Sequence, residues 1–158
     1  MAVAICTTAS ARNLLEIERI LAREQQLTPR SLAKLKQSRI AIARDGAKIV
    51  GWLVSEPLYG HVNELGAAFV LPDYRRRGIL GDLVGALVEP NTTYVAALFS
   101  PELSRYLCEN KGFVETTLMN IIRVSRGKFV TKRLSQSVRV ARHLSAQKAL
   151  YIVRMAQQ

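Results

Sequence analysis

The chain has 158 residues, of which 49% are hydrophobic and 22% are charged, and its formal net charge is +11. This length suits one domain with a single core, and the composition is that of a globular protein. No stretch approaches the roughly 20 consecutive apolar residues that a membrane span requires, and the first residues lack the basic leader of a signal peptide. We therefore expect a cytoplasmic protein without a membrane segment.

The two cysteines, Cys6 and Cys108, show no metal-ligand spacing. Such sparse cysteine use favours a reducing compartment over a disulfide framework. The sequence therefore predicts no metal site.

Hydrophobic periodicity and turn residues predict alternating strands and helices over the first 124 residues. The expected strands are 3–7, 40–44, 47–55, 61–71, 93–99, 113–117 and 118–124. Helices are expected to begin at Thr8 or Ser10, at Thr28-Pro29, at Gly78 and at Ser100-Pro101. The clearest hairpin lies at Asp45-Gly46, because Asp-Gly suits a type I′ turn.

The sequence after Val124 differs in charge and in periodicity. No Asp or Glu follows Glu115. The basic residues that follow Glu115 are Arg123, Arg126, Lys128, Lys132, Arg133, Arg139, Arg142, Lys148 and Arg154. One apolar stripe of helical spacing is formed by Val130, Leu134, Val138 and Ala141, with Lys132, Arg139, Arg142 and His143 on the other face.

We therefore expect a compact domain over residues 1–124 and a basic helical extension over residues 125–158. The basic face of the extension is either a solvated surface or a site for nucleic acid or another polyanion. The residues proposed for such binding are Lys132, Arg133, Arg139 and Arg142.

The stretch that organises the chain runs from a strand through a basic loop into a helix. The strand ends at Pro72, which cannot continue a central strand. Arg75-Arg76-Arg77 follow, and Gly78 opens an apolar helical segment. The first N–H groups of a helix lack internal partners and carry partial positive charge, so an anion can bind there. This arrangement predicts a phosphate site.

The run Val70-x-Pro72-x-Tyr74-Arg75-x-x-Gly78-Ile79 resembles the acetyl-CoA-binding motif of the GNAT superfamily of N-acetyltransferases. The core of that motif is written Q/R-x-x-G-x-G/A; Arg75 and Gly78 match it, whereas Leu80 stands where a small residue is usual. The resemblance implies a GNAT-like α/β (α+β) fold from Val3 to about Val124. Such a fold has a mixed, mostly antiparallel central sheet with flanking helices, to which this chain adds its basic C-terminal helix.

The resemblance further implies that acetyl-CoA is the cofactor. The N–H groups from Arg76 to Gly81 would hold its pyrophosphate, and the preceding strand would pair with the pantetheine arm like an added strand. The residues expected to bind the cofactor are Phe69, Val70, Leu71, Arg75, Arg76, Arg77, Gly78, Ile79, Leu80 and Gly81.

The acid that protonates the leaving thiolate is often a tyrosine in this family, four residues before a Gly-Phe pair. Gly112-Phe113 places that position at Cys108, with Tyr106 two residues away on a different helix face. Cys108 is either a functional thiol or a small buried hydrophobic residue. The asparagine that often opens this helix is replaced by Pro101.

For the base that deprotonates the amine, the resemblance points to Glu64, on the strand leading into the motif. His61 is the other candidate, since the unperturbed pKa of histidine suits the task. Either residue could instead be an edge residue that faces solvent. Glu56 and Tyr59, just before that strand, could line the acceptor pocket.

The predicted function is transfer of an acetyl group from acetyl-CoA to a primary amine by direct attack, without a covalent enzyme intermediate. The acceptor is left open between a protein, a nucleic-acid-associated amine and a metabolite, and a homodimer is compatible with the sequence. The alternative is a catalytically inactive GNAT-shaped binding or assembly protein that uses its basic C-terminal surface. The missing tyrosine and asparagine, together with Leu80, favour that alternative.

Overall fold

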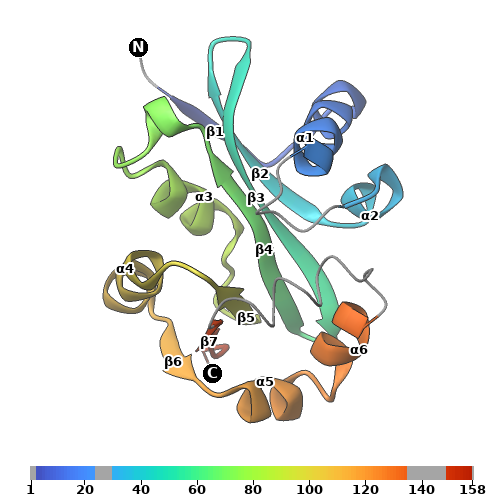
Figure 1. Ribbon diagram of the computed structural model, residues 1–158, viewed down its shortest axis with the longest axis vertical. Coiled ribbons are helices and arrows are strands. Elements are labelled where there is room, and N and C mark those ends of the chain that lie inside the picture. Colours follow the sequence, from blue (N-terminus) through green and yellow to red (C-terminus); the bar gives the residue numbers. More distant parts are fainter. Residues whose placement is uncertain (1–2, 24–29, 135–148, 158) are drawn as a thin grey trace. The chain divides into compact units, whose positions relative to one another are not determined.

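A computed structural model of the chain describes residues 3–23, 30–134 and 149–157 (Figure 1). The strands are β1 (Ala4–Cys6), β2 (Arg39–Asp45), β3 (Lys48–Tyr59), β4 (Val62–Val70), β5 (Thr93–Leu98), β6 (Val114–Thr116) and β7 (Leu150–Arg154). The helices are α1 (Ala11–Arg23), α2 (Leu32–Lys36), α3 (Ile79–Leu87), α4 (Pro101–Lys111), α5 (Leu118–Val124) and α6 (Lys128–Leu134), with a 3-10 turn, η1 (Pro72–Tyr74), after β4.

The strands follow the order β1-β2-β3-β4-β5-β7-β6. β4 and β5 pair in parallel, whereas β1–β2, β2–β3, β5–β7 and β6–β7 pair antiparallel. The predicted mixed, mostly antiparallel sheet with flanking helices is therefore confirmed. None of the helices in the described ranges is long and apolar enough to cross a membrane.

The chain divides into two compact units, and β3 and β4 each contribute to both. Unit 1 comprises Met1–Glu56 and Leu65–Val88. Unit 2 comprises Pro57–Glu64 and Glu89–Gln158.

In unit 1, the helices cover both sides of the strands. α1 and α2 lie on one side and α3 on the other (Figure 1). The predicted spacing of α1 buries Leu14, Ile17 and Leu21 against the strands, and the Ser10 hydroxyl accepts a bond from the Asn13 N–H. The core on this side consists of Leu14, Ile17, Leu21, Leu35, Ile40, Ile42, Ile49, Trp52 and Val54. Thr28-Pro29 lies outside the described residues, and α2 is instead capped by Ser31.

Two backbone features shape the end of β4 in unit 1. A Cβ atom on Gly51 would lie 2.9 Å from the Phe69 carbonyl oxygen and 3.2 Å from Val70 Cγ2, so a larger residue would push β4 away from β3. Ala67 has a φ of +49°, in the left-handed region that non-glycine residues rarely adopt. The strand is thus irregular just before the predicted cofactor site.

Unit 2 holds α4, α5 and α6 together with β5, β6 and β7. Its core consists of Val62, Val95, Ile121, Phe129 and Val153. α4 begins as predicted, because the Ser100 hydroxyl accepts a bond from the Leu103 N–H and Pro101 occupies the first turn.

Two predictions in this part are wrong. Leu118–Val124 is the helix α5 rather than a closing strand: the Thr117 hydroxyl caps its first turn, and Ile121 is the residue of this helix that becomes fully buried. Leu150–Arg154 is the strand β7 rather than part of a helical extension. β7 pairs with β5 on one side and β6 on the other, and its apolar and β-branched run from Leu150 to Val153 suits a strand.

α6 covers the start of the predicted C-terminal helix. The other residues assigned to that helix lie outside the described ranges. They are Val138, Arg139, Ala141, Arg142, His143 and Lys148.

Tyr74 connects the segment after β4 to the β2–β3 hairpin, whose turn has Gly46 at a φ of +59°. Its hydroxyl donates a 2.8 Å hydrogen bond to Asp45 Oδ2. This bond, then partial burial and the Asp45 charge, raise the pKa of Tyr74 above its ordinary value of 10.0.

The Tyr74→Phe variant should reveal this bond through its pH dependence. Because the folded pKa is raised, the bond stabilises the fold below pH 10.0 and is lost as pH rises through the folded pKa. Wild type should therefore unfold at higher urea concentration than Tyr74→Phe at neutral pH, and the gap should close at alkaline pH. Tyr106→Phe is the control, and a gap that widens above pH 10.0 would contradict the assignment.

Candidate functional site

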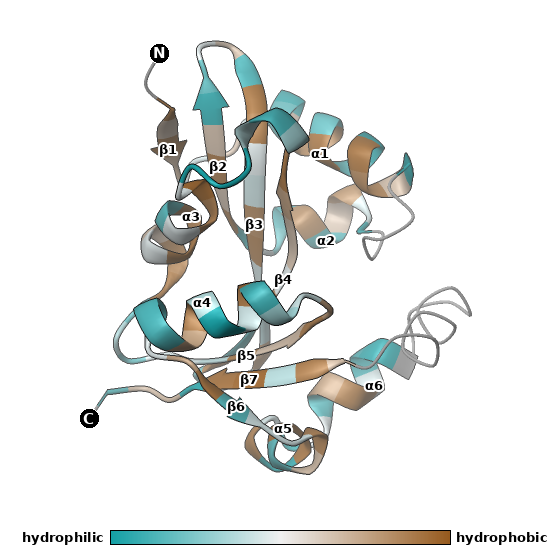
Figure 2. Ribbon diagram, turned by 60° about the vertical axis from the view of Figure 1, so that its left-hand side comes forward, coloured by the Kyte–Doolittle hydropathy of each residue, from teal (hydrophilic) through white to brown (hydrophobic). Residues whose placement is uncertain are grey.

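The loop between β4 and α3 presents unpaired backbone donors. Arg76 and Gly78 have φ values of +62° and +76°, both in the left-handed region. In the described part of the chain, the N–H groups of residues 76–81 have no acceptor, whereas the Asp82 N–H already bonds to the Gly78 oxygen at 3.1 Å. Left-handed residues between right-handed ones turn successive N–H groups to one side, which suits an anion. The loop is hydrophilic and leads directly into α3 (Figure 2).

The loop is tied back to the strand before it. Arg75 Nε donates a 3.0 Å bond to the Val70 carbonyl oxygen, and the Leu71 N–H donates a 2.9 Å bond to Val50. No atom lies within 4 Å of a Cβ built on Gly78, so the space in front of this residue is open. The loop is therefore held in place while its donors face an unfilled space.

The other residues predicted to bind the cofactor flank this loop in unit 1. Phe69 stacks on buried Trp52 with ring centroids 4.7 Å apart. Ile79 and Gly81 are buried on α3, and Leu80 is half-buried. The backbone N–H of Leu80 is among the unpaired donors, so its departure from the motif leaves the donor row intact.

In unit 2, Cys108 and Tyr106 lie half-buried on α4. Burial raises the pKa of the Cys108 thiol, with a smaller contribution from the negative charge of Glu115. Glu115 accepts a 3.3 Å bond from the Ser104 hydroxyl. The thiol therefore carries its proton at neutral pH.

Glu64 is enclosed by α6 rather than exposed. Its side chain is 3% exposed, and its two oxygens accept bonds from Lys132 Nζ at 2.7 Å and from Arg133 Nη2 at 2.6 Å. The Arg133 guanidinium also lies 4.4 Å from the Phe129 ring centroid. This geometry favours a role in anchoring α6 to β4, because both carboxylate oxygens are occupied.

The second base candidate, His61, and the two residues predicted to line the acceptor pocket, Glu56 and Tyr59, also have defined surroundings. Glu56 is buried in unit 1 in an ion pair with Arg30. His61 is exposed, and its carbonyl oxygen accepts a 2.9 Å bond from Thr93. Tyr59 is 43% exposed, and Arg126 donates a 2.8 Å bond to its hydroxyl.

Sequence reasoning missed the partners of Glu64 and Glu56, since no spacing rule connects residues so far apart in the chain. It also missed Lys48, whose Nζ lies 5.5 Å from the centroid of the Tyr74 ring. In the ranges that the structure covers, no three His, Cys, Asp or Glu side chains gather as metal ligands would.

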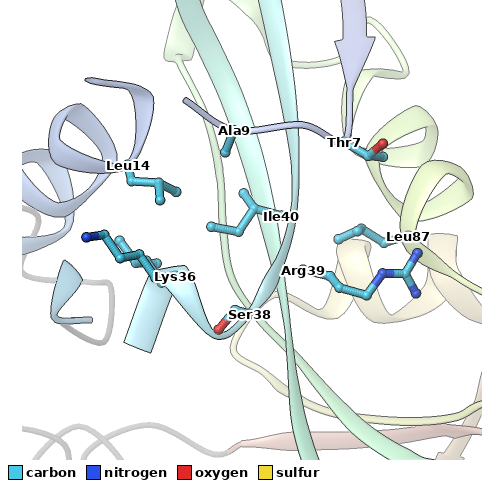
Figure 3. Close-up of a pocket in the computed structure, with 9 residues that line it drawn as sticks. Thr7, Ala9, Leu14, Lys36, Ser38, Arg39, Ile40 and Leu87 are labelled. Atoms are coloured by element: carbon cyan, nitrogen blue, oxygen red, sulfur yellow. The ribbon is translucent and has the colours of Figure 1, made fainter. Parts of the chain in front are cut away.

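Unit 1 also contains a cavity of about 290 Å³ away from the loop (Figure 3). Its lining mixes apolar residues with two hydroxyl groups and two cationic side chains. These residues are Thr7, Ala9, Leu14, Leu35, Lys36, Ser38, Arg39, Ile40 and Leu87.

Residues 9–90 match the model of the acetyltransferase (GNAT) family. None of the curated proteins matches the chain. Among solved structures, the chain resembles Rv2747 from Mycobacterium tuberculosis in complex with CoA, with 15% identity, a TM-score of 0.64, and coverage of 96% of this chain and 98% of that one.

Two further structures cover nearly all of both chains. The ribosomal-protein-S18-alanine N-acetyltransferase from Escherichia coli is 14% identical with a TM-score of 0.65, and covers 99% of this chain and 96% of its own. Ard1 from Thermoplasma volcanium is 17% identical with a TM-score of 0.65, and covers 100% of both chains. At such identities the likeness shows the fold. The family model, in contrast, covers more than half of the 158 residues, and the chain therefore belongs to the GNAT family of acetyltransferases, with acetyl-CoA as its cofactor.

Proposed function

We propose that this protein transfers the acetyl group of acetyl-CoA to a primary amine by direct attack on the thioester. The observation that carries the proposal is the row of unpaired N–H groups over residues 76–81, at the start of α3. The amine lone pair attacks the thioester carbonyl, the C–S bond breaks, and the amine gives up a proton while the thiolate gains one. No covalent enzyme intermediate is needed.

The cofactor would lie along the end of β4 and the following loop. The N–H groups of residues 76–81 would bind the pyrophosphate, supported by the exposed cations of Arg76 and Arg77. The pantetheine arm would run along Phe69–Leu71. The Val70 oxygen already accepts from Arg75, the Leu71 N–H donates to Val50, and the Leu71 oxygen accepts from the Tyr74 N–H. The arm would therefore pair with the remaining polar groups of this segment.

Cys108 is our candidate for the group that protonates the thiolate, because its raised pKa keeps the proton on sulfur at neutral pH. Tyr106 lies on the same helix and remains the second candidate. For Glu64 we propose a positioning role through α6, in place of the proton acceptance that the family resemblance implies. The amine would then lose its proton to water.

The acceptor is proposed to be a protein amine on an acidic or nucleic-acid-bound partner. The similar Escherichia coli protein is named for acting on a ribosomal protein, which supports a protein acceptor. The basic surface would rely on the exposed residues Arg123, Arg126 and Lys128. Lys132 and Arg133 are paired with Glu64, and Arg139 and Arg142 lie outside the described residues.

Gly78→Glu should abolish cofactor binding. A carboxylate placed in the open space before the donors would repel the pyrophosphate, and the Kd for acetyl-CoA should rise by about 100-fold in calorimetry. Gly60→Glu is the matched control, because Gly60 also has a positive φ, of +51°, and open space around it.

If Gly78→Glu binds acetyl-CoA as tightly as Gly60→Glu does, the proposed site is wrong. If wild type binds acetyl-CoA but acetylates no amine in a screen of protein N-termini and small amines, the inactive binding protein becomes the better explanation.

Cys108→Ala should lower kcat by roughly 100-fold, the lower range for general acid catalysis, with KM for acetyl-CoA unchanged. Cys6→Ala should leave both constants at the wild-type level, since Cys6 belongs to β1 of unit 1. Full activity of Cys108→Ala would mean that solvent or Tyr106 protonates the thiolate.

Glu64→Gln should act mainly on stability. Removing the charge leaves Lys132 and Arg133 without their carboxylate, and the free energy of unfolding should fall by about 3 kcal/mol, as for other buried ion pairs. The exposed Glu16→Gln is the control. A large loss of kcat in Glu64→Gln without loss of stability would restore Glu64 as the base.

A further inference from the structure

A second cationic site adjoins the loop proposed to bind the pyrophosphate. Lys48 Nζ lies 5.5 Å and Arg77 Cζ lies 5.2 Å from the centroid of the same Tyr74 ring. These two charges, from the β2–β3 hairpin and from the loop before α3, are therefore within about 11 Å of each other. Both segments lie at the same end of the strands of unit 1 (Figure 1).

The Tyr74 ring, which lies close to both cations, is itself held in place by a hydrogen bond. The Tyr74 hydroxyl donates to Asp45 Oδ2 at 2.8 Å, and Asp45 is the partner of Lys48 across the hairpin. Contact with an aromatic face favours the cations and restricts their side-chain freedom, so less ordering would remain to be done on binding.

The local charge balance favours an anion. Asp45 and Asp73 are the carboxylates of these two segments, while Lys48, Arg75, Arg76 and Arg77 are the cations. One Asp45 oxygen is occupied by Tyr74, and Arg75 is directed at the Val70 oxygen. Lys48 and Arg77 are both exposed, so their charges remain accessible to a ligand.

CoA carries a phosphate on the 3′-oxygen of its ribose, one sugar away from the pyrophosphate. Arg77 directly precedes Gly78, so it can reach a group next to the pyrophosphate, and a guanidinium binds phosphate well. We propose that Lys48 and Arg77, aligned by Tyr74, bind the 3′-phosphate and make this protein prefer CoA to dephospho-CoA. This inference rests on the proposed cofactor site.

The test compares the Kd values of CoA and dephospho-CoA by calorimetry at one fixed, low ionic strength. Wild type should bind CoA roughly tenfold more tightly, the combined effect expected from two exposed charge pairs. The double variant Lys48→Gln/Arg77→Gln should bind the two ligands about equally. Its Kd for dephospho-CoA should rise much less than its Kd for CoA, because the main pyrophosphate donors are backbone groups and Arg77 adds only a supporting charge there.

The matched control is Lys34→Gln/Arg19→Gln, which removes the same two charges from exposed positions on α2 and α1. It should keep the wild-type preference, which rules out a general effect of net charge. Tyr74→Phe keeps the ring that contacts both cations but loses the hydroxyl bond that holds it. This variant should therefore retain part of the preference for CoA over dephospho-CoA.

Equal binding of CoA and dephospho-CoA by wild type would overturn the inference and leave the proposed cofactor site intact. An equal loss of affinity for both ligands in the double variant would also overturn it, since the two residues would then act on the pyrophosphate. Failure of wild type to bind either ligand would overturn the proposed site and this inference together.

Discussion

The row of unpaired backbone donors at the start of α3 is the feature on which the proposed function of unit 1 depends. Those donors stay unpaired because Arg76 and Gly78 adopt left-handed conformations and because Arg75 ties the loop to Val70. Gly51 in turn allows the end of β4 to lie close against β3. The sheet therefore fixes one end of the loop and α3 the other, so that binding an anion would require little reorganisation.

The two acidic residues that the sequence places at the candidate site are held in ion pairs within the fold. Glu56 is paired with Arg30, and Glu64 with Lys132 and Arg133. A buried carboxylate held in this way costs a large desolvation penalty unless its partners stay in place, so it favours one arrangement of the elements it joins. In unit 2 the two bonds to Glu64 join α6 to β4. They also neutralise part of the positive charge of α6 inside the protein. The proposed acetyl transfer would then rely on an already activated thioester more than on a strong base.

Tyr74 serves the structure and, in the binding that we propose, would also serve recognition. Its hydroxyl donates a hydrogen bond to Asp45 of the hairpin. Its ring makes cation–π contacts with Lys48 and Arg77 at the edge of the proposed cofactor site. A tyrosine can do both because its polar atom and its aromatic faces act independently. The hairpin turn, which has no role in the motif itself, is thereby linked to the loop.

Local patterns in the sequence determined the hairpin at Asp45-Gly46, the α1 core face, the Ser100-Pro101 helix start and the strand-loop-helix before α3, because each depends on residues a few positions apart. The tertiary structure decided that Leu118–Val124 is a helix, because burial of Ile121 in the core of unit 2 adds to the Thr117 cap. It also decided that Leu150–Arg154 is a strand, because this segment pairs with β5 and β6. It also decided the partners of Glu64 and the place of Lys48 beside Tyr74. Contacts between residues far apart in the chain depend on how the strands assemble. Composition and periodicity therefore cannot predict them.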